Sequence, residues 1–472
     1  MNKLTFTLKQ HTPLIHFQPD QDGATLRASE VKPRLDRFII EKLGGIAELR
    51  KIHPNWLIGK DDQFALNYKL KIIADNSVNL LLDVKESTLK DRNTNELVHL
   101  FKTDNFPMFL SNMGGKQSKD ELKNFSFFKN VKFDLFLTSN SLKDEIENSI
   151  AGFLLVTNFG NRQSKGFGSF YLYPEDKFYK VPFSKYYFNL EYDQNISNRQ
   201  KYNRLFNDLD LFYRTLRGGI NQKLRHKDAS IGFINELKRQ NRYHRGADNN
   251  DYEEILYFKS LLFLYAKNNA DSQWEKKTIK ETFYLKSQPK VYGKSYMTDL
   301  QQEERIQNKA DKNSPLFYEN KKKFIFKDLL GLSTEESWYS YDDVITKGEA
   351  KLNKHGDYER VPEKEQTISR YTSPLFIKPI EYGSSFQIFI VNKESSHAEE
   401  RLQGNHFEIS NKTGKPLIQQ VYPDFSLESY LRFVFSPNNW NINTHVEIKF
   451  QESKQFLTLK KIFNEIQRNY IL

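Results

Sequence analysis

Strand and helix patterns alternate along the first 175 residues of the chain. Four segments alternate apolar and polar residues with the period of two that is typical of half-buried strands: residues 4–9, 66–72, 131–137 and 170–173. Apolar residues recur at helical spacing in residues 31–43 and 142–154, between these strands. A turn at residues 75–77 is predicted to connect the second strand to a partner strand at residues 78–83. The order β-α-β-β-α-β predicts a ferredoxin-like domain, a topology that RRM domains share.

The rest of the chain follows a less regular pattern. Strands are expected at residues 186–192 and 386–391, and helices at residues 201–216 and 253–265. Residues 285–365 are polar, mixed in charge and without a steady period, which favours a loop-rich insertion.

A short internal similarity favours two copies of the same fold. The segment HTPLIHF near the start resembles TSPLFIKP later in the chain. We therefore predict an α+β chain with two ferredoxin-like (RRM-like, βαββαβ) domains. The first spans residues 1–180 and carries a glycine-rich loop at residues 160–168. The second spans residues 181–472 and carries a basic helical insertion at about residues 198–268.

Composition limits the classes of protein to which the chain can belong. Its 472 residues exceed what one ordinary hydrophobic core supports, and 38% hydrophobic residues are typical of a folded protein. The absence of cysteine excludes disulfides, thiolate chemistry and zinc sites that need sulfur, and it fits a reducing cytoplasm. No run of about 18 apolar residues occurs, and the N-terminal pattern is that of a strand instead of a signal peptide. We therefore expect a cytoplasmic protein without a membrane span.

The chain is basic, with a formal net charge of +11. Residues 198–245 contain 12 Lys and Arg against 4 Asp and Glu, so this segment carries +8 of that charge. Such a segment either binds a polyanion or forms a solvated helix face, and charge alone does not choose among RNA, DNA and lipid.

A glycine-rich stretch with two cations follows the second predicted helix. It reads FGNRQSKGFGSF and contains Gly160, Arg162, Lys165, Gly166 and Gly168. Glycines permit positive φ and close approach of another chain, and exposed N–H groups beside two cations can bind phosphates. A helix C-cap followed by a β-bulge is the alternative explanation for the same glycines. The loop differs from Walker A and Rossmann loops, because it leads from a helix to a strand.

In this context the loop resembles the RAMP superfamily of CRISPR effector proteins, whose ferredoxin-like domains carry a glycine-rich loop between the second helix and the fourth strand. It is most similar to the G-x-x-x-R-x-x-x-G-F-G-S pattern of the first, end-capping subunit of the Cmr-type (type III-B) complex, although Gly160 precedes Arg162 by only two residues. The stretch LRASEVKPRL at residues 26–35 resembles the start of helix one in that family, with Pro33 in place of the usual glycine. The segment SRYTSPLFIKP resembles an arginine-x-x-serine-proline-leucine element of the same family.

The resemblance implies a non-catalytic subunit of a type III CRISPR interference complex in antiviral defence. Such a subunit holds guide RNA and the guide–target duplex near the 3′ end of the guide. Its partners would be guide RNA, target RNA and other RAMP subunits. We expect no cofactor and no metal, because the acidic pairs at residues 61–62 and 342–343 are sequence neighbours that a strand would point to opposite faces.

The candidate RNA-binding residues are cations and loop glycines. They comprise Arg27, Lys32, Arg34, Gly160, Arg162, Lys165, Gly166, Gly168, Arg214, Arg217 and Arg370. The first three lie where helix one starts, and their alternative role is that of solvated surface cations. Arg214 and Arg217 lie beside Tyr213, a combination that suits stacking on unpaired bases, or else they are snorkelling arginines of an amphipathic helix.

Two other functions are compatible with the sequence. A guide-processing endoribonuclease of the same superfamily would use a histidine as general base on a 2′-hydroxyl, and His11 and His16 lie close to the expected RNA path. Such enzymes carry their glycine-rich loop near the C-terminus, whereas here it falls at residues 160–168. The third interpretation is an assembly protein whose basic surface binds an acidic protein partner.

Overall fold

The computed structural model describes most of the chain. The described residues are 2–15, 25–59, 65–80, 84–90, 97–103, 125–227, 234–236, 239, 243–245, 251–284, 322–338, 341, 343–368, 371–393, 402–412, 414–438 and 440–470. The first of two compact units comprises Met1–Asp210, Phe376–Lys393 and Asn469–Leu472, and the second comprises Leu211–Leu375 and Glu394–Arg468. Both units combine helices with sheets, so the predicted α+β class is confirmed. None of the described helices has the length and apolar character that crossing a membrane requires.

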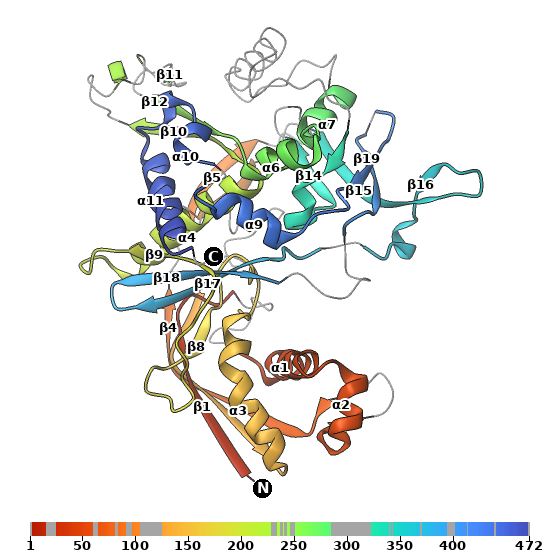
Figure 1. Cartoon of the computed structure of the whole chain (residues 1–472). Coiled ribbons are helices and arrows are strands. Elements are labelled where there is room, and N and C mark those ends of the chain that lie inside the picture. The colour runs from red at the N-terminus through yellow and green to blue at the C-terminus, as the bar shows by residue number, and fades with distance from the viewer. Residues whose placement is uncertain are drawn as a thin grey trace. The chain divides into compact units, whose positions relative to one another are not determined.

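A four-stranded antiparallel sheet with two helices on one face forms the N-terminal part of the first unit (Figure 1). Its strands, in spatial order, are β4 (Tyr68–Leu80), β7 (Phe125–Leu137), β1 (Asn2–Gln10) and β8 (Phe170–Leu172). The helices are α1 (Ala28–Lys42) and α3 (Asn140–Leu155). The connection from α1 to β4 contains α2 (Ile46–Ile52), β2 (Leu57–Ile58) and β3 (Ala65–Leu66). The main elements thus follow one another as β-α-β-β-α-β, as the pattern of residues 1–175 predicts.

The alternation of β1 explains how this sheet packs against its helices. Leu4, Phe6 and Leu8 are at most 2% exposed and belong to one core cluster with residues of α1 and α3. Phe6 lies opposite Phe133 of β7, which in turn lies opposite Ile72 of β4. Each such side chain contributes roughly 1.5–3 kcal/mol when it is fully buried. The polar residues that alternate with them in β1 lie on the other face of the sheet.

The turn predicted at residues 75–77 is wrong. β4 continues through these residues to Leu80, and its register with β7 extends from Tyr68 opposite Leu137 to Leu80 opposite Phe125. The partner strand of residues 66–72 is therefore β7, more than 40 residues later in the chain. β5 (Val84–Lys90) and β6 (Leu97–Thr103) form a separate antiparallel pair between them. A partner so distant in sequence leaves no local turn signal.

A second sheet of the first unit has the order β17-β18-β9. β9 (Tyr186–Glu191) and β18 (Ser385–Asn392) occur where strands are expected at residues 186–192 and 386–391. β17 (Leu375–Tyr382) precedes β18 in a hairpin, and α4 (Asn198–Arg217) follows β9. Near the other end of the chain, Asn469 donates a hydrogen bond to the main-chain oxygen of Tyr187 over 3.5 Å.

The second unit contains two further sheets and several helices. One sheet has the order β10-β12-β11, from β10 (Ile220–Lys227), β11 (Tyr243–Arg245) and β12 (Asp251–Phe258). The other has the order β13-β20-β19-β15-β14, with β16 paired to β15, from β13 (Phe324–Ile325), β14 (Glu335–Trp338), β15 (Asp343–Leu352), β16 (Tyr358–Arg360), β19 (His406–Ser410) and β20 (Leu417–Val421). The helices are α6 (Leu261–Ala270), α7 (Glu275–Phe283), α9 (Leu427–Phe435), α10 (Ile442–His445) and α11 (Lys454–Arg468).

Two predictions for this part of the chain are wrong. The helix expected at residues 253–265 is the end of strand β12 followed by α6, which starts after Ser260, whose hydroxyl accepts a hydrogen bond from Phe263 N over 3.1 Å. Among the described residues, the segment 198–268 thus combines helices with the strands β10, β11 and β12. Of the segment expected to be loop-rich, residues 285–321 lie outside the described residues, whereas from residue 322 onward it forms strands, because β15 pairs with β19 far along the chain.

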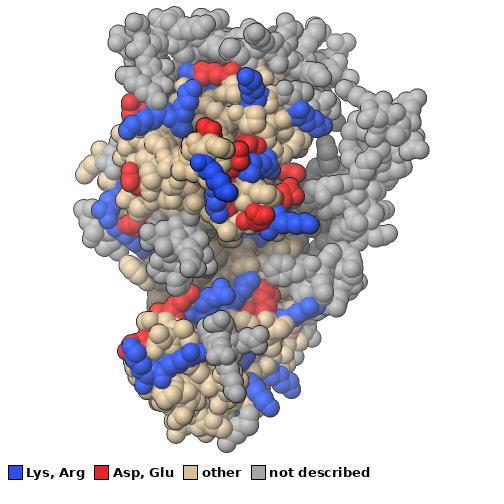
Figure 2. Space-filling view, turned by 90° about the vertical axis from the view of Figure 1, so that its right-hand side faces the viewer, with Lys and Arg blue, Asp and Glu red and all other residues tan. Residues whose placement is uncertain are grey.

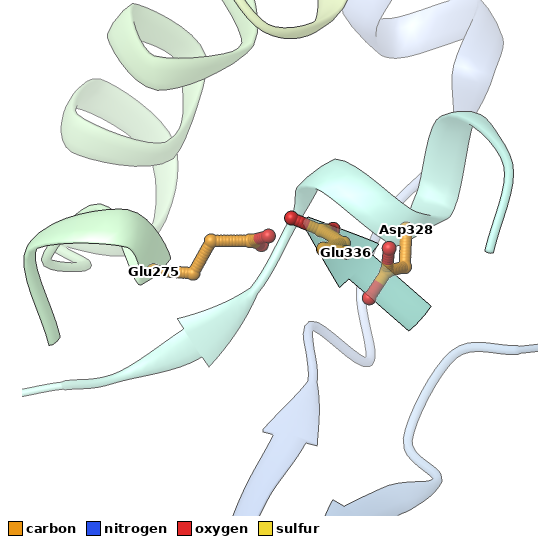
Figure 3. Close-up of side chains that lie close together, drawn as sticks. All are labelled: Glu275, Asp328 and Glu336. Atoms are coloured by element: carbon orange, nitrogen blue, oxygen red, sulfur yellow. The ribbon is translucent and has the colours of Figure 1, made fainter. Parts of the chain in front are cut away.

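A buried network of opposite charges lies in the second unit. The carboxylates of Glu275, Asp328 and Glu336 converge so that one oxygen of each lies within 4.8 Å of the others (Figure 3). The ammonium group of Lys347 lies 2.6 Å from Asp328 and 3.3 Å from Glu336, so a lysine of the chain compensates the charge that a metal ion would otherwise compensate. Although burial opposes its charged form, these carboxylates raise the pKa of Lys347. The three acids therefore form a structural ion-pair network around Lys347.

Replacement of Lys347 by methionine tests this network. We expect a loss of about 3–5 kcal/mol in the free energy of unfolding, because the buried carboxylates of Asp328 and Glu275 would lose the ammonium group beside them, whereas Glu336 keeps Lys327 at 2.6 Å. The deficit should shrink as the pH falls from 7 to 5: burial already raises the pKa of Asp328, loss of the ammonium group would raise it further, and a carboxyl group whose pKa is higher in the folded state stabilises that state once it is protonated.

Lys351→Met, at a half-exposed lysine of the same strand, is the matched control and should change stability by no more than about 0.5 kcal/mol. Denaturant titration at both pH values measures the difference. Equal losses in the two variants would contradict the network.

Candidate nucleic-acid interface

The glycine-rich loop lies in the first unit, where it follows α3 and contacts the end of β1. Phe159 N donates to the oxygen of Gly168 over 2.9 Å and closes the loop at its base. Gly168 N donates to Pro13 O over 2.8 Å, and Asn161 N donates to Ile15 O over 2.8 Å. The loop main chain is thereby fixed along the segment that follows β1.

Gly160 and Gly168 are required by contacts within the protein. Both have positive φ, +74° and +64°. A Cβ atom at Gly160 would overlap the main-chain oxygen of Ile15, and one at Gly168 would overlap that of Phe159. Gly166 is also enclosed, since a Cβ there would lie 2.9 Å from Pro379. The glycines therefore allow the protein's own strands to approach, and the structure gives them a packing role in place of the C-cap and bulge expected as the alternative.

Two hydroxyl groups and a buried amide add to this frame. Thr12 Oγ1 donates to Gly166 O over 2.7 Å and accepts from Ser169 N over 2.9 Å. Ser169 Oγ donates to Pro379 O over 2.6 Å. Asn158 Nδ2 donates to Gln163 O over 2.7 Å and to Ile377 O over 2.9 Å, so it links the loop to β17.

Lys378 of β17 is the residue of this frame that the sequence predictions missed. Its fully buried ammonium group donates to the oxygens of Thr157 and Phe170, each over 2.8 Å, and to Asn158 Oδ1 over 3.2 Å. Burial lowers its pKa well below the usual value, and the charge of Lys393 lowers it further. The segment FIKP belongs to the stretch that resembles the family, but the resemblance singles out Arg370 and assigns no role to Lys378.

Arg34 connects helix α1 to the loop. Its guanidinium donates to Asn158 O over 3.1 Å and to Gln163 Oε1 over 2.7 Å, and it lies 3.3 Å from Glu30. Glu30 in turn accepts a hydrogen bond from Gly160 N over 3.0 Å. Burial lowers the pKa of Arg34, which the charge of Glu30 partly offsets. With 32% of its side chain exposed, Arg34 keeps a surface that a ligand can reach.

Arg162 and Lys165 lie on the loop on either side of Gln163, one of the two residues that Arg34 contacts. Both residues are half-buried, and Lys165 N donates to Arg162 O over 3.0 Å in a turn. Arg162 has a φ of 59°, which few residues other than glycine adopt. Arg34, Arg162 and Lys165, three of the predicted cations, thus belong to one contact between α1 and the loop.

Arg27 and Lys32 are not part of this group of three. Arg27 is the N-cap residue of α1 and is half-buried. Lys32 pairs with Asp36 at 2.6 Å, donates to Leu66 O over 2.9 Å and lies over the ring of Tyr68. These contacts hold α1 against β3 and β4.

The second predicted group, around α4, has a structural role in the second unit. Arg217 donates to Lys327 O over 3.2 Å and also to Gly331 O. Tyr213 is 6% exposed and donates to Leu330 O over 3.0 Å, so the prediction that it stacks on unpaired bases is wrong. Arg214 is half-buried in the same turn. Arg370 lies outside the described residues.

His11 is not placed to act as a general base on RNA. It is 3% exposed, and its Nδ1 accepts a hydrogen bond from Glu381 N over 3.0 Å. Burial lowers the pKa of this imidazole well below its usual value, and the charges of Lys9 and Lys378 lower it further. A buried neutral ring without solvent access argues against the predicted alternative catalytic role of His11. His16 lies outside the described residues.

The charged side chains around the interface are mixed in sign. On the face drawn in Figure 2, lysine and arginine side chains lie among aspartate and glutamate side chains over the described surface. Among the predicted cations themselves, Arg34 pairs with Glu30 and Lys32 with Asp36. Position on the loop, more than the total charge, distinguishes the candidate cations.

Two glycine-to-alanine variants of the first unit test the packing role of the loop. Gly168→Ala should cost at least about 2 kcal/mol, because it adds backbone strain at positive φ to an overlap with Phe159 O. Gly152→Ala lies on an exposed position of α3, where the new methyl group meets only an ordinary contact 3.5 Å away, and should stabilise by roughly 0.5–1 kcal/mol. Thermal and denaturant unfolding measure the change in the free energy of unfolding of each variant. Similar changes in the two variants would refute the packing role.

Comparison of the sequence with known protein families identifies two matching domain models. A Cmr1 N-terminal domain model matches residues 1–220, and a Cmr1 C-terminal domain model matches residues 257–461. A search of curated proteins found no match.

Similar solved structures are distant. The crystal structure of Cmr1 from Pyrococcus furiosus (apo form) is 11% identical with a TM-score of 0.27, over 55% of this chain and 89% of that chain. A cryo-EM structure of the type III-B Cmr-beta bound to cognate target RNA gives 14% identity and a TM-score of 0.24, over 36% of this chain and 58% of that chain, a little over half its length. A further cryo-EM structure shows the type III-B Cmr-beta bound to cognate target RNA and AMPPnP, in state 2, in the presence of ssDNA. It is 13% identical with a TM-score of 0.26, over 83% of this chain and 96% of that chain. The family assignment rests on the two domain models, which together match most of the sequence: the chain belongs to the Cmr1 family.

Proposed function

We propose that the chain is a non-catalytic, RNA-binding subunit of a type III-B CRISPR effector complex in the cytoplasm. In this role it holds guide RNA and the guide–target duplex near the 3′ end of the guide, and it contacts other RAMP subunits and target RNA. The observation that carries the proposal is a group of three cations in a chain of the Cmr1 family: Arg162 and Lys165 on a loop fixed to β17 and to the segment after β1, and Arg34 of α1, which contacts that loop.

The fixed loop suits binding of an RNA backbone. Arg34 contacts Gln163 and Asn158, so its guanidinium is held before any ligand arrives and less conformational entropy is lost on binding. Arginine and lysine at these positions can make charge-assisted hydrogen bonds to phosphate oxygens. Contacts of this kind hold backbone and shape, while base pairing between guide and target supplies sequence specificity.

We also infer that the chain contains two ferredoxin-like RAMP domains, at residues 1–180 and 181–472. The order β-α-β-β-α recurs in the second half as β9, α4, β17, β18 and α11, and the sheet order β17-β18-β9 is that expected of such a domain. In this interpretation α4 belongs to the domain itself. The inserted residues then begin at β10 and precede β17.

Reversing the charge of the two loop cations tests the proposed RNA interface directly. The Arg162→Glu/Lys165→Glu variant should bind a short labelled guide RNA roughly tenfold more weakly, and the slope of log affinity against log salt should fall by about 1.4, since each phosphate contact to a single strand contributes about 0.7. Fluorescence anisotropy over a range of salt concentrations measures both quantities. Thermal unfolding of the variant shows whether the fold persists.

Lys51→Glu/Lys143→Glu is the matched control, because it makes the same charge change on helices α2 and α3 of the first unit. It should leave the salt slope nearly unchanged. If the loop variant and the control bound RNA equally well, and complexes isolated with the loop variant kept their guide RNA, the proposed interface would be wrong. Loss of an acidic protein partner alone would favour the assembly-protein interpretation.

A further inference from the structure

We propose that the face of the four-stranded sheet opposite α1 and α3 is a second binding surface, which contacts single-stranded RNA through Phe136 and the surrounding lysines. The lysines are Lys3 of β1, Lys69 and Lys71 of β4, and Lys132 of β7. This inference extends the proposed RNA-binding role to a surface that shares no residue with the glycine-rich loop.

The strand register places an aromatic ring between two lysines. Phe136 of β7 lies opposite Lys3 on one side and opposite Lys69 on the other. Directly opposed residues of antiparallel strands project from the same face, so these three side chains form one row. The ammonium group of Lys3 lies 5.9 Å from the centre of the Phe136 ring. Phe136 is half-buried while Lys3 and Lys69 are exposed, so part of the ring surface remains accessible between two cations.

The next two rows of the same face carry further lysines. Asp134 lies between Thr5 and Lys71, and Lys132 lies between Thr7 and Ile73. The opposite face at these strands carries the buried core, so alternation assigns all three rows to the face away from the helices. Lys71 and Lys132 are exposed.

The only acid in these three rows is already neutralised. Asp134 lies 2.8 Å from Lys3 and accepts a hydrogen bond from Thr5 over 2.7 Å. Burial opposes ionisation of Asp134, but the hydrogen bonds from Lys3 and Thr5 and the charges of Lys3 and Lys71 lower its pKa. It is therefore ionised at neutral pH and balances one of the four lysines. The remaining charge of about +3 is complementary to phosphates.

The combination of ring and charges favours a single strand over other partners. Base stacking on an exposed aromatic ring requires unpaired bases, and lysines on both sides can contact the flanking phosphates. An acidic protein would use the lysines but would gain less from a ring placed between two of them. An RNA duplex would present no unpaired base to the ring.

Three variants of the full chain test the surface with a fluorescein-labelled, uridine-rich RNA that does not fold. Lys69→Gln/Lys71→Gln should lower the salt slope by about 1.4, because two phosphate contacts are lost. Phe136→Leu keeps an apolar side chain but removes the aromatic face, and should weaken binding by about fivefold or more. Lys51→Gln/Lys143→Gln removes the same number of positive charges, but from helices α2 and α3. It should leave the salt slope as it is in the unmodified chain.

The outcomes separate this inference from the proposed function. If the sheet variants bind like the unmodified chain while Arg162→Glu/Lys165→Glu loses affinity, the second surface is refuted and the loop interface stands. If neither set of variants affects binding, both are refuted. If the sheet variants keep RNA affinity but lose a protein from isolated complexes, the surface belongs to a protein partner and the inference falls.

Discussion

The first unit depends on the close approach of three main-chain segments. The glycine-rich loop, the segment after β1 and strand β17 meet within hydrogen-bonding distance, through Gly168 N to Pro13 O, Ile377 N to Ser164 O, and Ser169 Oγ to Pro379 O. No side chain fits between them at Gly160 or Gly168. The candidate cations Arg162 and Lys165 are therefore attached to a part of the fold that has little freedom to move.

A buried lysine completes this arrangement at an energetic cost. Lys378 has three neutral acceptors for the three hydrogens of its ammonium group, but the described residues around it supply no carboxylate. Burial of a charge without a counter-ion is unfavourable, which is why its pKa is lowered. Two of those acceptors, at Thr157 and Phe170, are main-chain oxygens at the two ends of the loop. The side chain thus binds both ends together, and the same residue stabilises the loop and sets its position.

The sequence predicted the local features of this fold and missed those that depend on distant partners. The alternation of Leu4, Phe6 and Leu8 was enough to define β1 and its buried face, and the motif at residues 159–170 located the loop. The continuation of β4 through residues 75–77 depends on pairing with β7, and β12 depends on pairing with β10. The role of Lys378 was not predictable, because the carbonyl groups that hold it come from residues more than 200 positions earlier.

The two faces of the first sheet hold their cations in different ways, and this difference bears on what each can bind. On the helix side, Arg34 and Lys32 are fixed by Glu30 and Asp36, so a phosphate there must compete with a carboxylate for part of each charge. On the other face, four lysines share one carboxylate, which pairs with Lys3 and leaves the long side chains of Lys69 and Lys71 exposed. A fixed arginine selects a ligand of defined geometry, whereas mobile lysines accept many backbone conformations. The loop interface that we propose would thus match a regular duplex backbone, and the proposed sheet surface a flexible single strand.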